Sequence, residues 1–286
     1  MNLLKIINAD EYSSYNEKEK STSGLELREL RNTVNEIISA VRTDGDRALF
    51  HYSMLFEKAV PKVFEVPREK AKEAWEELEQ KEPLLADALK LATNNIRIFN
   101  EAQKDQLNNF EKEISPGLLC GQRVIPVQKA AVYVPGGRFP LISSALMSLI
   151  PASIAGVEEK FLVSPPGSDA LPNRNILAAG YLAGADRFFA LGGAQAIASL
   201  AIGTESVPKV DLIVGPGNKY VAEAKALLYG EVGIDFIAGP TDLLIISDCL
   251  EEDHDKLEII AADMLAQAEH DPDARARVLL PSKLSA

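Results

Sequence analysis

The chain has 286 residues, of which 47% are hydrophobic, and a formal net charge of −12 at pH 7, which is typical of one large globular domain or two smaller ones. No apolar run approaches the roughly 20 residues that span a bilayer, the N-terminus does not resemble a secretory signal, and no basic cluster suits nucleic acid. We therefore expect a cytoplasmic protein that binds a small molecule and neither a membrane nor nucleic acid.

Residues 25–127 have the patterns of a helical region. Apolar residues at helical spacing predict helices over about 25–43, from Asp46 to about Phe56, over 67–80 and over 83–108. Their Glu- and Lys-rich stretches are typical of solvated helix faces, and Trp75 is expected to pack in a core. We assign no chemistry to this region.

From about residue 128 onward, short apolar strands alternate with helices. Strands are predicted over 130–134, 160–163, 187–191, 211–214, 234–237, 243–247 and 277–280, and helices over 143–155, 194–201 and 219–228. This alternation predicts an α/β fold, with incomplete Rossmann-like parallel sheets that carry helices on both faces and follow the helical N-terminal region.

Glycine-rich turns follow several of these strands. They are Pro135–Gly137, Gly192–Gly193 and Gly215–Asn218. Ligands of parallel sheets bind beyond the carboxyl ends of the strands, where glycine lets the backbone approach a phosphate at a helix N-terminus. A true G-x-G-x-x-G fingerprint is absent, because Tyr220 stands where the third glycine would be. Each turn alone could be an ordinary connection between a strand and a helix, but the three turns together favour one ligand-binding crevice.

Polar residues near the C-terminus suggest a second site. Thr241 and Asp242 precede a strand, where they could orient a polar substrate or simply form a turn. Further along, Gln267 and His270 lie three positions apart at the end of an apolar-faced helix, a spacing that suits two ligands of one metal ion. Alone the pair is weak evidence, because histidine is also favoured at helix C-termini, and the remaining ligands must come from elsewhere.

Five segments, in order and spacing, resemble the histidinol dehydrogenase family. They are Val132–Gly137, Leu191–Ala198, Val214–Asn218, Ile237–Pro240 and Gln267–His270. The resemblance covers nearly the whole chain and implies a zinc- and NAD-dependent enzyme of histidine biosynthesis. In this family two molecules of NAD accept hydride in turn, as L-histidinol is oxidised through histidinal to L-histidine.

The resemblance also implies roles for individual residues. Tyr133, Gln195 and Asn218 are expected to contact NAD, and Gln267 and His270 to bind Zn²⁺ and, with Thr241, the substrate L-histidinol. Thr241 stands where the family has a substrate-contacting serine, and Asp242 where a glutamate usually follows. These departures leave open a paralogous zinc dehydrogenase for another polar alcohol, such as sulfopropanediol.

Members of the family continue well beyond the position of Ala286. Their remaining part supplies a Glu–His pair for proton transfer, an aspartate ligand of zinc and a histidine ligand from the partner subunit. We therefore expect no catalytic proton-transfer residue in these 286 residues, a truncated chain that is inactive by itself, and a homodimer. A non-catalytic nucleotide-binding or assembly module is the other alternative.

The sequence pattern and the resemblance together predict the domain bounds. Residues 1–24 form an N-terminal segment, and 25–127 with 239–286 form a first, helix-rich α/β domain that is cut short at its C-terminus. Residues 128–238 form a second, Rossmann-like domain that binds NAD.

Overall fold

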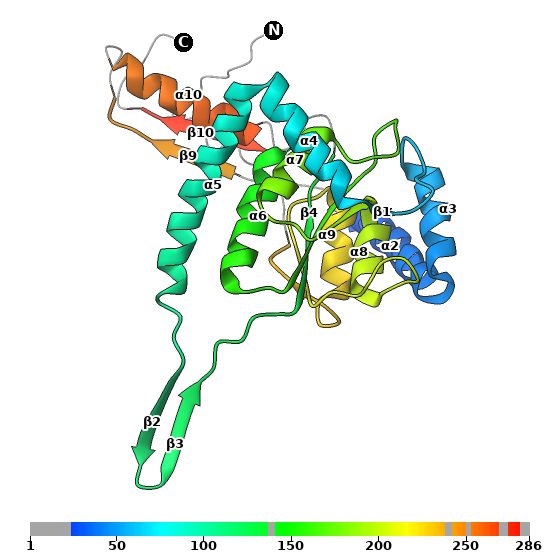
Figure 1. The fold of residues 1–286 in the computed structure, drawn as a ribbon, viewed down its shortest axis with the longest axis horizontal. Coiled ribbons are helices and arrows are strands. Elements are labelled where there is room, and N and C mark those ends of the chain that lie inside the picture. Colours follow the sequence, from blue (N-terminus) through cyan, green and yellow to red (C-terminus); the bar gives the residue numbers. More distant parts are fainter. Residues whose placement is uncertain (1–23, 137–140, 238–241, 250–252, 269–273, 281–286) are drawn as a thin grey trace. The chain divides into compact units, whose positions relative to one another are not determined.

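The computed structural model describes residues 24–136, 141–237, 242–249, 253–268 and 274–280 (Figure 1). The chain divides into two compact units, Asn32–Ala238 and Met1–Arg31 with Gly239–Ala286. Residues 32–127 fall in the unit that contains the larger sheet, and residues 239–286 fall in the other unit. The domain bounds of the whole protein stay a prediction.

The larger unit is built on a six-stranded sheet with the order β1-β6-β5-β4-β7-β8. Its strands are β1 (Glu65–Val66), β4 (Lys129–Tyr133), β5 (Glu159–Ser164), β6 (Arg187–Ala190), β7 (Leu212–Val214) and β8 (Gly233–Ile234). The strands from β4 to β8 run parallel, and β1 pairs with β6 in the antiparallel direction. The predicted α/β class with a mainly parallel sheet is confirmed.

Helices cover both faces of this sheet. Figure 1 shows α6 (Ile142–Ala155) and α7 (Arg174–Leu182) on one side of β4, and α8 (Gly193–Ile202) and α9 (Lys219–Leu228) on the other. Helix α7 was not predicted, because it is only nine residues long and has a glycine in its interior. That glycine, Gly180, is required by packing, since a Cβ there would lie 2.5 Å from the Leu162 side chain.

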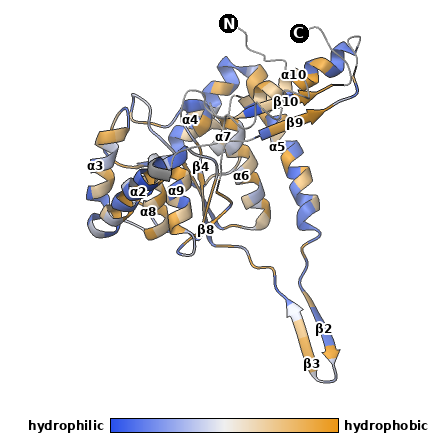
Figure 2. Cartoon of the chain, turned by 180° about the vertical axis from the view of Figure 1, so that it is seen from behind, coloured by the Kyte–Doolittle hydropathy of each residue, from blue (hydrophilic) through white to orange (hydrophobic). Residues whose placement is uncertain are grey.

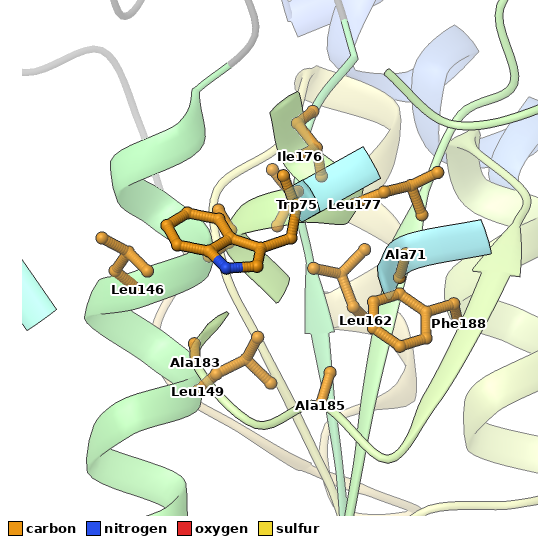
Figure 3. Close-up of a cluster of buried hydrophobic side chains, with 14 of the residues drawn as sticks. Ala71, Trp75, Leu146, Leu149, Leu162, Ile176, Leu177, Ala183, Ala185 and Phe188 are labelled. Atoms are coloured by element: carbon orange, nitrogen blue, oxygen red, sulfur yellow. The ribbon is translucent and has the colours of Figure 1, made fainter. Parts of the chain in front are cut away.

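The N-terminal region is helical, as predicted. It contains α2 (Gly24–Asp44), α3 (Asp46–Phe56), α4 (Arg68–Lys81) and α5 (Pro83–Lys104). Helix α4 packs against α7, and α5 packs against α6. Trp75 of α4 is buried with Leu146 and Leu149 of α6 and Ile176 of α7 in the cluster that Figure 3 shows, which confirms its packing role. This packing places α4 and α5 in the same unit as the sheet.

A hairpin that the sequence did not predict follows α5. Helix α5 ends at Lys104 instead of about residue 108, and β2 (Phe110–Ser115) pairs with β3 (Leu118–Gln122) in the antiparallel direction. Every residue of both strands is exposed, including Cys120. Such a hairpin shows no alternation between buried and exposed positions, which is the signal that reveals half-buried strands.

The smaller unit contains two parallel strands and a helix. Strands β9 (Asp242–Ile246) and β10 (Arg275–Leu279) pair in register, and α10 (His254–Ala268) contacts both. This arrangement confirms the strands predicted over 243–247 and 277–280 within about two residues. In the part of the chain that the structure describes, no helix is long and apolar enough to cross a membrane.

Candidate functional site

The point where the strand order reverses lies between β4 and β7. The chain passes from β4 to β5 and β6 on one side, and then returns to place β7 and β8 on the other side of β4. Open α/β sheets bind ligands at such a point, beyond the carboxyl ends of the strands. Tyr133 is the last residue of β4, and Gly215–Asn218 directly follows β7. The topology therefore brings Tyr133 and the loop Gly215–Asn218, both predicted to bind the cofactor, to the point where the strand order reverses.

Gly215 allows these two segments to touch. Its φ angle is +109°, and a Cβ at this position would lie 2.1 Å from the carbonyl oxygen of Tyr133. Any larger residue would be both strained and in collision with backbone. The loop after β7 therefore passes directly against the end of β4.

Asn218 begins helix α9. Its Oδ1 atom accepts hydrogen bonds from the backbone N–H groups of Tyr220 (3.0 Å) and Val221 (3.1 Å), as an N-cap residue does. These two bonds use the oxygen of the side-chain amide. Its Nδ2–H₂ group remains to donate a hydrogen bond to a ligand.

Tyr133 links the end of β4 to the turn before α8. Its side chain is buried, and its hydroxyl oxygen accepts a hydrogen bond of 3.2 Å from the backbone N–H of Gly193. Burial raises the pKa of Tyr133 to about 12. The phenol therefore stays protonated at neutral pH and keeps an O–H group that can donate.

Gln195 lies in the first turn of α8 and is 1% exposed. Its amide lies beside the carboxyl of Glu57 and acts to lower the pKa of that carboxyl. Among the described residues, neither Oε1 nor Nε2 makes a hydrogen bond of full geometry, and the same holds for Ser164 Oγ at the end of β5. Buried polar atoms are almost always paired in folded proteins. A primary amide can both donate and accept, so Gln195 has the unused capacity that a polar ligand at the sheet edge requires.

Glu57 joins this group from the end of α3, and sequence analysis missed it. Its Oε1 atom accepts a hydrogen bond of 2.7 Å from the backbone N–H of Gly192, and burial raises the pKa of its carboxyl. The two residues are 135 positions apart in the sequence. No local pattern could indicate this contact. The turn before α8 is therefore held by Glu57 at Gly192 and by Tyr133 at Gly193.

The predicted metal-binding residues lie in the smaller unit. Gln267 of α10 lines a pocket of about 250 Å³ together with Leu243, Asp263 and Ala266. Asp263 stands one helical turn before Gln267, and both residues line this pocket. Thr241 and His270 lie outside the described residues. Within the described ranges, no group of three His, Cys, Asp or Glu residues could hold a metal ion.

Asp242 has a structural partner. Its Oδ1 atom lies 2.6 Å from Nη1 of Arg277, in an ion pair that joins β9 to β10. This contact accounts for an aspartate at the start of β9 without a role in substrate binding.

The family model described as histidinol dehydrogenase matches residues 20–286. The chain belongs to the histidinol dehydrogenase family. The histidinol dehydrogenase of Aquifex aeolicus is 48% identical over 257 residues, which cover 89% of this chain and 57% of that protein. A histidinol dehydrogenase of Prochlorococcus marinus is 46% identical over 253 residues, with 88% of this chain and 55% of that protein covered.

A solved structure supports the same relationship. The crystal structure of histidinol dehydrogenase from Elizabethkingia anophelis has a TM-score of 0.79 and 33% sequence identity, and the match covers 93% of this chain and 58% of that chain. The chain therefore spans little more than half the length of the histidinol dehydrogenases that it matches.

The residues predicted from the resemblance to histidinol dehydrogenase fall into two groups. Tyr133 contacts Gly193 and Gly215, which lie in the turns that precede Gln195 and Asn218 at the carboxyl ends of the strands. Gln267 lies in the other unit and lines a pocket there. The roles of all these residues stay predictions, as do those of Thr241 and His270.

Proposed function

We propose that the chain is the NAD-binding part of a zinc-dependent histidinol dehydrogenase, which oxidises L-histidinol through histidinal to L-histidine in the last steps of histidine biosynthesis. The observation that carries the proposal is the position of Tyr133 beside the point where the strand order reverses, where it touches Gly215 of the turn before Asn218 and binds Gly193 of the turn before Gln195. The buried amide of Gln195, which makes no hydrogen bond of full geometry with the described residues, supports a ligand at this edge.

In this proposal the two glycine turns bind NAD. The N-termini of α8 and α9 follow these turns, and their helix dipoles favour the negative charge of a pyrophosphate. The N–H groups of Gly192 and Gly193 are already bonded to Glu57 and Tyr133 in this structure. Asn218 donates from its Nδ2 amine, Tyr133 from its protonated hydroxyl, and Gln195 pairs through both amide atoms. Bound NAD would supply the hydride acceptor.

Zinc belongs to the smaller unit in this proposal. Gln267 and His270 would bind Zn²⁺, and Thr241 would contact L-histidinol beside it. Gln267 already lines a pocket with the carboxylate of Asp263, although two donors alone do not complete a zinc site. Bound zinc would orient the substrate as a Lewis acid without changing its oxidation state.

We further propose that turnover needs residues beyond those in this chain, and that the active protein is a cytoplasmic homodimer. The match covers only 57% of the Aquifex aeolicus relative, and the resemblance implies that the proton-transfer pair and further zinc ligands lie in the remaining part of such proteins. Histidinol-dependent NADH formation is therefore expected from a protein of the family's full length and not from the 286 residues alone.

The test compares both proteins in one assay. Zinc content is measured by mass spectrometry, and NADH formation from L-histidinol, NAD and added zinc is followed by absorbance. Activity in the longer protein alone is expected. Activity with another polar alcohol, such as sulfopropanediol, and none with L-histidinol would assign the paralogous function instead. Absence of both NAD binding and turnover in the longer protein would contradict the proposal.

Asn218→Ala tests the cofactor site itself, with Asn173→Ala as its control. Asn173 also caps a helix, since its side chain accepts a hydrogen bond of 2.9 Å from the N–H of Asn175. Each substitution should lower the free energy of unfolding by about 1 kcal/mol. Only Asn218→Ala should also weaken NAD binding, measured by titration calorimetry.

A further inference from the structure

A buried ion pair contacts Gly215 in the loop Gly215–Asn218. Lys225 of α9 is 2% exposed, and its Nζ atom forms an ion pair with Oδ1 of Asp235, just after β8. The same Nζ donates a hydrogen bond of 3.1 Å to the carbonyl oxygen of Gly215. Lys225 therefore joins the loop after β7 to the segment after β8.

Asp235 holds the other side of the same glycine. Its Oδ2 atom accepts a hydrogen bond of 2.8 Å from the backbone N–H of Gly215, and its Oδ1 accepts one of 2.7 Å from the N–H of Phe236. The pair thus binds both the N–H and the C=O of Gly215, the residue with φ of +109° that passes against Tyr133. Three residues later Asn218 begins α9.

A buried ion pair is weak evidence for a role in stability. Removing two charges from water carries a large free-energy cost, and apolar replacements of similar size are often neutral or stabilising. A buried ion pair in which both charges also bind backbone is better suited to fix one backbone conformation. Here the fixed conformation is the sharp turn that sets the direction of the loop Gly215–Asn218.

A second lysine provides a comparison at the opposite end of the strands, in a pair whose carboxylate, Asp186, is 44% exposed against 19% for Asp235. Lys160, at the start of β5, pairs with Asp186 at 2.8 Å and donates to the carbonyl oxygen of Val157 at 3.3 Å. Asp186 in turn accepts a hydrogen bond from the backbone N–H of Lys160. The chemistry resembles that of Lys225 and Asp235, but these polar contacts involve no residue of the proposed cofactor site.

We propose that Lys225 and Asp235 are positioning residues for the cofactor. They hold Gly215 so that Asn218 caps α9 with its Oδ1 atom and presents its amide Nδ2–H₂ group to the ligand. The inference rests on the proposed function for the identity of that ligand, NAD. The positioning of the loop itself is a separate property that can be measured without the cofactor.

The experiment compares Lys225→Met with Lys160→Met in the full chain. Hydrogen–deuterium exchange is measured for the peptide that contains 215–218, together with the free energy of unfolding and the Kd for NAD. Lys225→Met should speed exchange of this peptide about tenfold beyond any change in global stability, and raise the Kd at least about tenfold. Lys160→Met should lower stability while leaving loop exchange and Kd within about twofold of the wild-type values.

Asp235→Asn is the second variant, for the case in which Lys225→Met does not fold. It keeps the size of the side chain but removes the charge that pairs with Lys225, so the same loop should open and NAD binding should weaken. Wild-type loop exchange in Lys225→Met or Asp235→Asn would overturn the inference, as would equal loss of NAD affinity in Lys160→Met.

Failure of the proposed function has a different signature. If the wild-type chain binds no NAD, and a protein of the family's length binds none either, the cofactor assignment fails. Faster exchange of 215–218 in Lys225→Met would then still support the positioning role of the pair.

Discussion

Gly215, which follows β7, lies directly against Tyr133 at the end of β4, beside the proposed cofactor site. Gly215→Ala would place a Cβ 2.1 Å from the carbonyl oxygen of Tyr133, at a φ of +109°. Neither atom belongs to a flexible side chain, so backbone must move. We expect the free energy of unfolding to fall by about 3 kcal/mol or more, measured by urea denaturation followed by circular dichroism.

Gly230→Ala is the control for this substitution. Gly230 has a φ of +99°, but a Cβ there would meet nothing within 4 Å. Its replacement should cost only the conformational strain, about 1 kcal/mol. Equal losses in the two variants would show that the contact with Tyr133 is not tight.

Glu57 should make stability depend on pH in a defined direction. Burial raises the pKa of its carboxyl above the usual 4.5, so the folded state holds this proton more tightly than the unfolded state. Stability from this group is therefore fully present below pH 4.5 and is lost as the pH rises through the raised pKa. Glu57→Gln cannot ionise, and its stability relative to the wild type should increase over this range. Urea denaturation across a pH series measures the difference.

Glu57→Ala separates the charge from the hydrogen bond. Glutamine keeps an oxygen for the N–H of Gly192, whereas alanine leaves that buried donor unpaired. Glu57→Ala should follow the same pH trend as Glu57→Gln but lie below it at every pH. A difference between Glu57→Gln and the wild type that stays constant with pH would contradict the prediction.

Sequence analysis could find some residues of the candidate site and not others, for a physical reason. Tyr133 and Asn218 stand beside glycine turns at strand ends, and their place is encoded locally. Glu57 and the pair of Lys225 with Asp235 act through contacts between separate elements. Nothing in their own neighbourhoods distinguishes them from the many solvated carboxylates and lysines of the chain.

Among the helices and strands, buried elements could be predicted from their apolar sequence pattern, and fully exposed elements could not. Strands β4 and β5 are almost entirely buried and were recognised as apolar runs. Helix α7 was missed because close packing against Leu162 requires Gly180 in its interior, and glycine weakens the helical pattern. The hairpin was missed because all its residues are exposed.

The hairpin formed by β2 and β3 should be the least protected part of the large unit. Two strands without a third strand or a packed helix are marginally stable in water. We expect amides of 110–122 to exchange orders of magnitude faster than those of β5, measured by hydrogen–deuterium exchange in the native chain.

Cys120 of β3 gives an independent measurement, because it is exposed while Cys249 is buried. Cys120 should react at once with a thiol reagent in the native protein, and Cys249 more slowly. Cys120→Ser should remove the fast phase. Slow exchange of the hairpin together with an unreactive Cys120 would show that a second copy or another partner covers it.

At the scale of the whole molecule, the two units differ in how much apolar surface they bury. The large unit has a core in which Phe161, Leu162 and Phe188 are completely buried. In the small unit, no described residue of α10 is buried. Several of its apolar side chains are more than half exposed: Leu244, Ile246, Ile259, Leu265 and Leu279. Figure 2 shows this hydrophobic character along β9, β10 and α10.

These exposed residues lead to a prediction about the small unit. A two-stranded sheet with one helix buries too little surface to be stable alone, whereas further strands and helices would cover the apolar positions of α10 and β9. The relatives have additional length that could supply them. In a protein of that length, amides of 254–268 should therefore exchange far more slowly than in the 286-residue chain. Hydrogen–deuterium exchange on both proteins measures this, and β5 serves as an internal control that should not change. If α10 were already as protected as β5 in the shorter chain, its apolar residues would have to be covered by a contact within this chain or with a second copy.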